Sequence, residues 1–372
     1  MATIRAAVSR YRWAMAVAFC LAVFMSGQAE AQGADETKIL LLQSKPKAYA
    51  VIEAASKSEN PRARLAALEA AQHAPDIAFA LARNGLSDEN PAVRFAALVT
   101  VGKLKINKLA DAAMDLMRDD NESVRAAALF AAKRCGKDVD LSPLAGMLAT
   151  GSAGARANAA MLIGQLGDKQ AIDMLRDMAA APMTRVSPAE RTWVRLQYAE
   201  AMIRLDPDDA QVLGTIRASV YSNLDDVRIL AIQILGEVGD QSVQGGLAHI
   251  IKRDNPIQVK IAAAQSLVRM GDKPAAKVIL KAAGYDEQQL RKDLKSYLTN
   301  AGAAGPEAQA IRDLLADDKA RARAAAEVRA QAAIGLGYVK SKAAAERLSA
   351  LLNDPDPIVR IAAASSILRA SR

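Results

Sequence analysis

Few side chains in this chain of 372 residues combine the types and the spacing that catalysis or metal binding requires. The only histidines, His73 and His249, lie far apart in the sequence, so local spacing does not pair them as metal ligands. The chain contains no Gly-rich phosphate loop, no Gly-x-Ser-x-Gly elbow and no cluster of metal-binding residue types. These patterns predict a non-catalytic protein that holds neither a metal nor a cofactor.

Paired carboxylates and one cysteine are the remaining reactive groups. The pairs Asp119-Asp120, Asp208-Asp209 and Asp317-Asp318 fall in predicted turns or helix starts, where a carboxylate caps free N–H groups and favours the helix dipole. Cys135 stands at a helical position where related stretches carry Leu, Val or Met. We therefore expect caps rather than acid–base pairs, and a buried small side chain rather than a reactive thiol.

These residues are distributed over a repeated helical element, which residues 225–240 illustrate and whose clearest copies begin at Val93, Val124 and Val359. Apolar residues recur there at positions 0, 3, 4, 7, 8 and 11, counted from Val227, which is the stripe of an amphipathic helix. The pattern Val-Arg-x-x-Ala-Ala-x-x-Leu returns about every 31 residues. Its cation, at position 1, aligns at Arg64, Arg94, Arg125, Arg156, Arg195, Arg228, Lys260, Arg291, Arg329 and Arg360. The copy at Arg291 is degenerate, because Asp293 occupies an apolar position.

Each copy reads as a helix, a turn and a second helix, and no strand pattern occurs. Four second helices open with Asn or Asp before Pro, a favourable helix start, at Asn60, Asn90, Asn255 and Asp356. The Ala pairs at positions 3 and 4 let neighbouring helices approach closely. One unit cannot bury its own faces, so the units must stack. Ten stacked units predict an all-α solenoid with a continuous core, an arc roughly 80–100 Å long.

The repeat resembles the short HEAT-like repeats of the phycobilisome-lyase type, over roughly residues 37 to 370. This resemblance implies a right-handed α-solenoid of about ten HEAT-like helix-turn-helix repeats that serves mostly as a binding scaffold. Some HEAT-like enzymes bind two irons through His-Glu pairs, and this chain has no His-Glu dipeptide. Related bilin lyases and DNA-repair proteins work inside cells.

Residues 1–31 have the pattern of a secretory signal peptide. Arg5, Arg10 and Arg12 precede an apolar run over 14–25, and Ala29-Glu30-Ala31 supplies the small residues of a cleavage site. The run is too short to span a bilayer, so the mature chain is expected to have no transmembrane span. The prediction is a protein of the periplasm or a secreted protein, with the solenoid over 32–372. Export argues against the bilin-lyase and DNA-repair roles.

Removal of the predicted signal leaves 46 basic and 40 acidic residues, a net charge of +6. The charges are interspersed, as on solvated helix faces. This pattern, without a basic stripe and interleaved aromatic residues, argues against a nucleic-acid partner. Weak association with anionic envelope components stays open.

The recurring cation at position 1 has two interpretations. Stacked cations could form a ladder that binds a polyanion. In repeats of this type, however, the equivalent Arg usually bonds turn carbonyls or an acidic residue of a neighbouring turn, such as Asp88, Asp120, Asp254 or Asp354. We expect the structural role, because the cation follows the repeat and not any cluster.

One insertion marks a candidate partner-binding surface. The gap before Arg195 is 39 residues instead of about 31, and the extra residues surround Met183 and Arg185. Trp193 follows, at position −1, where other units carry mostly polar or small residues. Insertions in solenoids often lie on the binding face, and exposed Trp and Arg are common interface anchors. The alternative is that the longer loop covers Trp193.

Together these observations predict an exported, non-catalytic scaffold that binds a protein partner through an extended solenoid surface, with Trp193, Arg185 and Met183 as contacts. Two alternatives stay open. The chain could be an enzyme accessory or lyase-like HEAT module, or an envelope-associated protein that binds polysaccharide or lipid.

Overall fold

The computed structural model describes residues 35–184, 186–253, 255–300 and 306–372, and every regular element within these ranges is a helix. The predicted all-α solenoid is therefore confirmed. The predicted signal peptide lies outside the described residues.

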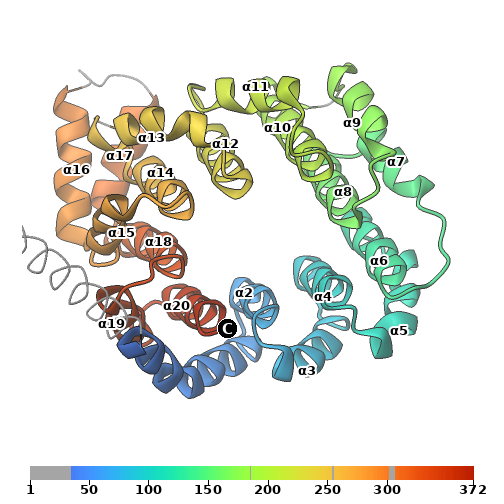
Figure 1. The fold of residues 1–372 in the computed structure, drawn as a ribbon, viewed down its shortest axis with the longest axis horizontal. Coiled ribbons are helices and arrows are strands. Elements are labelled where there is room, and N and C mark those ends of the chain that lie inside the picture. Colours follow the sequence, from blue (N-terminus) through green and yellow to red (C-terminus); the bar gives the residue numbers. More distant parts are fainter. Residues whose placement is uncertain (1–34, 185, 254, 301–305) are drawn as a thin grey trace, which may run out of the picture.

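The helices form two layers, which Figure 1 shows as an inner and an outer ring. The inner layer holds α2 (Pro61–Ala71), α4 (Pro91–Leu104), α6 (Glu122–Arg134), α8 (Ala153–Leu166), α10 (Pro188–Leu205), α12 (Asp225–Val238), α14 (Ile257–Arg269), α18 (Asp318–Leu336) and α20 (Pro357–Ala370). The outer layer holds a helix over 35–56, α3 (Pro75–Gly85), α5 (Ala110–Asp115), α7 (Ser142–Thr150), α9 (Ala171–Ala180), α11 (Ala210–Ser219), α13 (Gln244–Lys252), α15 (Ala276–Ala282) and α19 (Lys342–Leu351).

The solenoid closes on itself. Helix α20, at the C-terminal end, packs against α2, just as each other inner helix packs against its neighbours (Figure 1). Polar contacts also join the two ends of the ring at this seam. Lys342 Nζ lies 2.9 Å from Glu36 Oε2, and Arg372 Nη2 donates to the Gln72 carbonyl at 2.9 Å. The prediction of an open arc is therefore wrong. Curvature depends on the small rotation from unit to unit, and nine inner helices close a full turn with about 40° each.

The predicted stripe is the core between the layers. Val227 and Leu235 are 2% and 0% exposed. The inner helices approach closely at position 9, where Gly236 lies so near α14 that an added Cβ would stand 2.8 Å from Ser266 Cα. Hydroxyl groups at position 7 link successive inner helices, since Ser266 donates to the Ile232 carbonyl at 2.8 Å. These small side chains keep the inner helices in register.

The recurring cation has the structural role that the sequence predicted. Arg94 reaches Asp119 of the next turn through two hydrogen bonds of 2.8 and 2.9 Å. Its Nη1 donates to the carbonyls of Asp88 and Glu89. Arg64 repeats this geometry with Asp88.

The same scheme recurs later in the chain, with variations. Arg329 pairs with Asp354. Asp120 accepts from Arg125 through its backbone carbonyl rather than its carboxylate. Asp254 lies outside the described residues. The cations of position 1 therefore bind the turns of the repeat.

Three of the four predicted helix caps are confirmed. The side chains of Asn60, Asn90 and Asp356 accept from backbone N–H groups of the helices that they precede. Asn255 does not cap α14. Its side chain instead accepts from Arg228 Nη2 at 2.8 Å, and so takes the place that Asp88 and its equivalents hold elsewhere.

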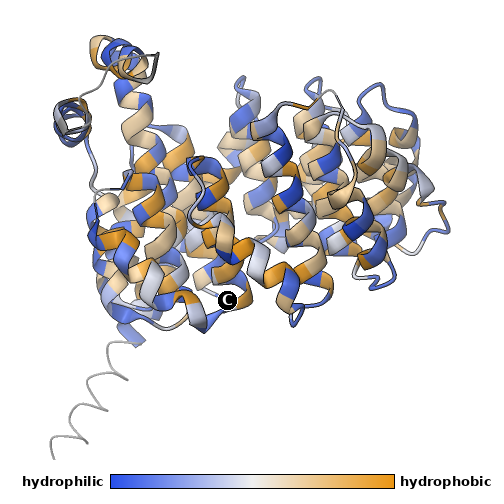
Figure 2. Ribbon diagram, turned by 90° about the horizontal axis from the view of Figure 1, so that it is seen from above, coloured by the Kyte–Doolittle hydropathy of each residue, from blue (hydrophilic) through white to orange (hydrophobic). Residues whose placement is uncertain are grey.

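The degenerate copy at Arg291 does not form an inner helix. Arg291 lies on α16 (Glu287–Asn300), which pairs with α17 (Pro306–Ala316), while α18 packs directly against α14 and α15. Figure 2 shows this pair at upper left, standing off one rim of the ring. The hydrogen bond from Arg329 Nη1 to the Tyr285 carbonyl, at 3.0 Å, joins the chain just before α16 to α18, which follows the α16–α17 excursion. One repeat therefore consists of α15 and α18 with a helical hairpin inserted between them.

Candidate functional site: a charged lumen

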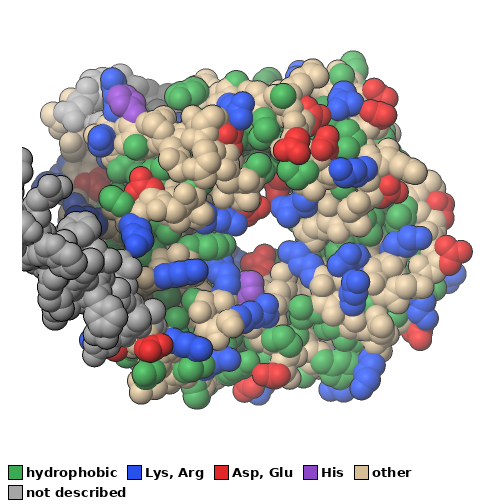
Figure 3. All heavy atoms as spheres, viewed as in Figure 1, with side chains coloured by type: hydrophobic (Ala, Val, Ile, Leu, Met, Phe, Trp, Pro, Cys, Tyr) green, Lys and Arg blue, Asp and Glu red, His purple; other side chains and the backbone are tan. Residues whose placement is uncertain are grey.

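The ring encloses a lumen, and side chains at position 10 of several inner helices act on one another across it. In Figure 3 the molecule is hollowed at its centre to small openings, and Lys and Arg side chains stand around them. Position 10 falls at or just beyond the C-terminal end of each inner helix, where a cation favours the helix dipole. We call the following residues the lumen belt: His73, Lys103, Arg134, Gln165, Arg204, Glu237, Arg269, Tyr338 and Arg369.

Contacts between neighbours join much of the belt into one network. Lys103 Nζ donates to Gln72 Oε1 at 3.2 Å. Glu237 lies 3.4 Å from Arg204 on one side and 3.4 Å from Arg269 on the other. Arg204 also pairs with Glu200, one turn earlier on α10, at 3.0 Å. Position 10 is therefore more than a solvated edge, because its side chains bridge separate repeats.

An aromatic ring lies between two guanidinium groups in the belt. The Cζ atoms of Arg269 and Arg369 lie 4.6 and 4.0 Å from the centroid of the Tyr338 ring, which fits cation–π stacking. Arg369 also donates two hydrogen bonds: Nη1 to the Tyr338 hydroxyl oxygen at 3.0 Å, and Nη2 to the Ile334 carbonyl at 2.7 Å. Burial lowers the pKa of Arg369, as does nearby Arg269, although Tyr338 acts in the opposite direction. The stack thus joins α14 and α20 to Tyr338, which lies just beyond the end of α18.

Charges influence each other across the lumen. Burial between the walls lowers the pKa of Lys103, and so does Arg204, while Glu69, Glu237 and Glu200 oppose that shift. Helices α10 and α12 lie across the ring from α4 (Figure 1). Lys103 is nevertheless exposed to solvent, so the walls enclose its charge without covering it. The lumen is thus narrow enough for opposite walls to share one electrostatic environment.

The same enclosure affects the carboxylates and the histidine. Burial raises the pKa of Glu69 and of Glu200, since the charged forms lose solvation. Burial, followed by the charges of Arg369, Arg372 and Lys103, lowers the pKa of His73 to about 4. His73 is therefore neutral at pH 7 and contributes no charge to the belt.

The residues predicted as partner contacts occupy different environments. Met183 is 3% exposed, so its side chain is not presented on the surface of the free protein. Trp193 is half-buried and packs against the core, and Arg185 lies outside the described residues. Trp193 shares one face of α10 with Glu200 and Arg204, at helical spacings of seven and eleven residues, and so belongs to the lumen side. Partner binding by these three residues stays a prediction.

Most of the lumen residues were missed by the sequence analysis. The signal was nonetheless present, because position 10 is polar in all nine units that form inner helices. The sequence analysis considered the recurring Arg at position 1 instead, but its hydrogen bonds go to the turns of the repeat. A position that is polar in every unit, on a helix whose other faces are buried, indicates a face that is not covered by the core.

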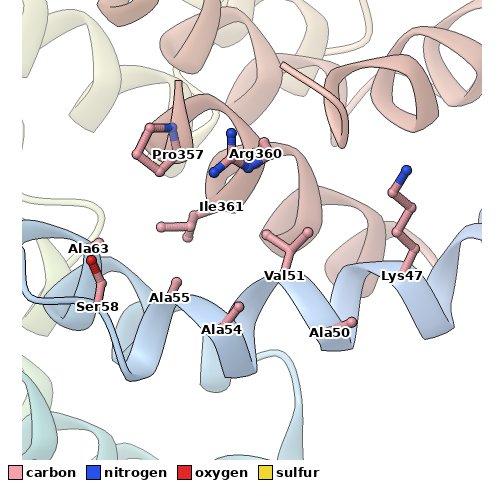
Figure 4. A pocket seen from close by; sticks show the side chains of 10 residues that line it. All are labelled: Lys47, Ala50, Val51, Ala54, Ala55, Ser58, Ala63, Pro357, Arg360 and Ile361. Atoms are coloured by element: carbon pink, nitrogen blue, oxygen red, sulfur yellow. The ribbon is translucent and has the colours of Figure 1, made fainter. Parts of the chain in front are cut away.

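A groove lies at the seam, apart from the lumen belt. It is a cavity of about 340 Å³ between the helix over 35–56 and α20. Figure 4 shows Val51 and Ala54 on one side of it and Ile361 on the facing helix, with the cations Lys47 and Arg360 also among its lining residues. Arg360 Nη1 donates to the Asp354 and Pro355 carbonyls, so this cation is held by its own turn.

The other reactive groups show no convergent arrangement. Cys135 is half-buried at the C-terminal end of α6, and burial raises the pKa of its thiol, as expected for a packing residue. Among the described residues, no group of three or more His, Cys, Asp or Glu side chains is arranged to hold a metal ion. None of the helices described is long and apolar enough to cross a membrane.

The fold and the lumen define a class of protein, a closed α-solenoid with a charged central channel. Comparison with known families assigns it further. A model described as HEAT repeats matches residues 48–133, 212–298 and 309–370, more than half of the chain, and one described as PBS lyase HEAT-like repeat matches 155–180. The chain belongs to the HEAT-repeat family.

One solved structure illustrates the similarity. It is the complex of CpcE and CpcF of phycocyanin lyase from Nostoc sp. PCC7120, with 19% sequence identity and a TM-score of 0.37. The match covers 63% of this chain and 92% of that one. No curated protein matches the chain.

Proposed function

We propose that this protein is an exported, non-catalytic scaffold that binds a protein partner, with the lumen and its mouth as the binding site. The observation that supports this most is the lumen belt. Core packing explains the apolar positions, turn binding explains position 1 and the helix dipole favours cations at position 10, but none of these requires a polar side chain at position 10 in every unit. A continuous polar face on a preformed frame loses little ordering entropy on binding.

Capture from the source organism tests partner binding. Tagged mature protein is incubated with envelope extract, and retained proteins are identified by mass spectrometry. The matched comparison uses Lys103→Glu, which alters the lumen, and Lys277→Glu on the outer helix α15, where the side chain is exposed. A partner that is retained by the wild type and by Lys277→Glu, but lost with Lys103→Glu, supports the proposal. Equal retention by both variants would place binding elsewhere.

Export has a separate test. Protein isolated from its source is expected to begin at Gln32, after the Ala29-Glu30-Ala31 site. Sequencing of the N-terminus checks this. A chain that keeps residues 1–31 in the cytoplasm would contradict the export proposal and would reopen intracellular partners.

A lyase-like accessory role is the second candidate, and the PBS lyase HEAT-like repeat at 155–180 favours it. That role predicts binding of a linear tetrapyrrole, which absorption spectroscopy detects as a shift and sharpening of the pigment band. An unchanged pigment spectrum at excess mature protein would remove this candidate.

A further inference from the structure

We propose that the lumen binds an extended acidic peptide segment, with carboxylates on the cations of the belt and apolar side chains between them. This inference rests on the proposed function and specifies its partner. The argument has three parts: the charge of the belt, the dimensions of the lumen and its exposed apolar groups.

The charge of the belt favours an anionic occupant. Five of its residues are cations and one, Glu237, is a carboxylate that two of the arginines already share. Glu200 is likewise paired with Arg204, and the charge of Glu69 acts on Lys103. Arg372 adds a further cation near His73, where its Nη2 bonds the Gln72 carbonyl. The partial negative charge of the helix ends offsets part of this excess, and a carboxylate-bearing ligand would offset the rest.

The dimensions of the lumen favour an extended chain. Figure 3 shows small openings at the centre of the molecule, which do not admit a folded domain. The charges of Arg204 and Glu237, on α10 and α12, also act on Lys103 across the ring. An inner helix of 14 residues, such as α4, is about 21 Å tall. A peptide of about ten residues in extended form is roughly 33 Å long and would pass through the ring.

Apolar groups on the same faces select a peptide over a uniform polyanion. Ile334 is 45% exposed although it belongs to an inner helix, and it lies one turn before Tyr338 on the same face. Trp193 occupies the same face of α10 as Glu200 and Arg204. A chain in which carboxylates alternate with apolar side chains matches this mixed wall.

Fluorescence anisotropy tests the inference with defined peptides. The probe is a fluorescein-labelled peptide of about ten residues in which Glu alternates with Leu, Ala and Gly, spanning the lumen as estimated above. Its controls are the same peptide with Gln in place of Glu, and dextran sulfate as a competitor without apolar groups. We expect the mature protein to bind the Glu peptide at least about tenfold more tightly than the Gln peptide, and more weakly as salt rises from about 50 to 500 mM.

Variants locate the site. Lys103→Gln and Arg204→Gln together are expected to weaken binding of the Glu peptide by at least about tenfold, whereas Lys277→Gln on the outer layer leaves it within about twofold. Trp193 supplies a second readout, since it is the only tryptophan among the described residues. Its emission is expected to shift when the unlabelled Glu peptide binds.

Three results would overturn the inference. The first is equal affinity for the Glu and Gln peptides. The second is that dextran sulfate, compared at equal charge, displaces the labelled peptide as well as unlabelled Glu peptide does. The third is an equal loss of affinity in the lumen variant and the outer-layer variant. If envelope capture still depends on the lumen while the Glu peptide does not bind, the scaffold function stands and the acidic-peptide assignment fails. Loss of capture as well would remove both.

Discussion

Replacing Arg94 by Ala tests whether the recurring cation holds the ring together. Arg94 donates four hydrogen bonds, two to the Asp119 carboxylate and two to the carbonyls of Asp88 and Glu89. The side chains of Arg94 and Asp119 are 18% and 7% exposed. The substitution therefore leaves a largely buried carboxylate and two carbonyls without their shared donor.

The magnitude follows from that burial. Breaking a buried ion pair by removing one partner destabilises by about 3–5 kcal/mol. Asp119 keeps its bond from the Asn121 N–H at 2.9 Å, and Arg94 is partly exposed, so we expect the lower end, about 3 kcal/mol. The pKa of Asp119 is held below its usual value despite burial, through Arg94 and the Asn121 N–H. Stability from this group is thus present above the unfolded pKa and is lost as the pH falls.

Arg176 supplies the matched control. It lies on the outer helix α9 and also pairs with two carboxylates, Asp173 at 2.8 Å and Asp209 at 3.1 Å, but its side chain is 46% exposed. Arg176→Ala is expected to change stability by less than about 1 kcal/mol. Urea unfolding followed by circular dichroism at pH 7 measures both variants. If Arg176→Ala destabilises as much as Arg94→Ala, burial does not decide the strength of these pairs and the reasoning is refuted.

Three further predictions concern the core and the lumen. Leu235→Asp, which buries an unpaired charge, is expected to destabilise by several kcal/mol in urea unfolding, whereas Glu237→Gln is expected to destabilise by less than about 1 kcal/mol. Similar values for both would mean that the apolar stripe of α12 is misassigned. Gly236→Ala is expected to destabilise by about 1–3 kcal/mol although Ala favours helices, because its Cβ would press on Ser266; a gain in stability would show that α12 and α14 can separate freely. The pKa of His73 is about 4 in the folded protein and about 6.5 in the unfolded chain, so the unfolded chain binds more protons between these values and stability falls as the pH drops from about 6.5 to about 4. His73→Gln is expected to remove this part of the pH dependence of stability. Parallel profiles of stability against pH for the wild type and the variant would count against the prediction.

The sequence predicts the repeat well because each unit carries its own local signals. Apolar residues at helical spacing place Val227 and Leu235 in the core, and the Asn-Pro and Asp-Pro starts place three of four helix caps correctly. The role of Arg94 was also predictable, since a cation that recurs at one position meets a carboxylate that recurs in the next turn. Asn255 shows the limit of this logic, because the same side chain can serve a cap or a neighbouring Arg.

Ring closure was not predictable from the repeat. The rotation between units depends on contacts of individual atoms, such as that of Gly236 with Ser266, and small changes in it accumulate over nine joints. The excursion at Arg291 was also misleading, since its Val-Arg-like spacing copies the repeat while its helix packs outside the inner layer. Helical periodicity shows that a face is covered, but it does not identify the helix that covers it.

The lumen could be predicted only in part. Trp193 was singled out because most other units carry a polar or small residue at its position, and helical spacing places it on the face of α10 that also carries Glu200 and Arg204. The belt itself depends on closure, which brings His73 and Arg369, from opposite ends of the described chain, into one electrostatic environment. Residues so distant in sequence show no local pattern that joins them.

Closure also limits how such a protein can change in evolution. An open solenoid gains or loses a unit and becomes longer or shorter, with its other joints undisturbed. Here the loss of one inner helix would leave a gap of about 8–10 Å at the seam, and every remaining joint would have to tilt further to restore the contact between Arg372 and Gln72. Copy number is therefore a property of the whole ring, and new length is accommodated where it leaves the circumference unchanged, as in the α16–α17 hairpin.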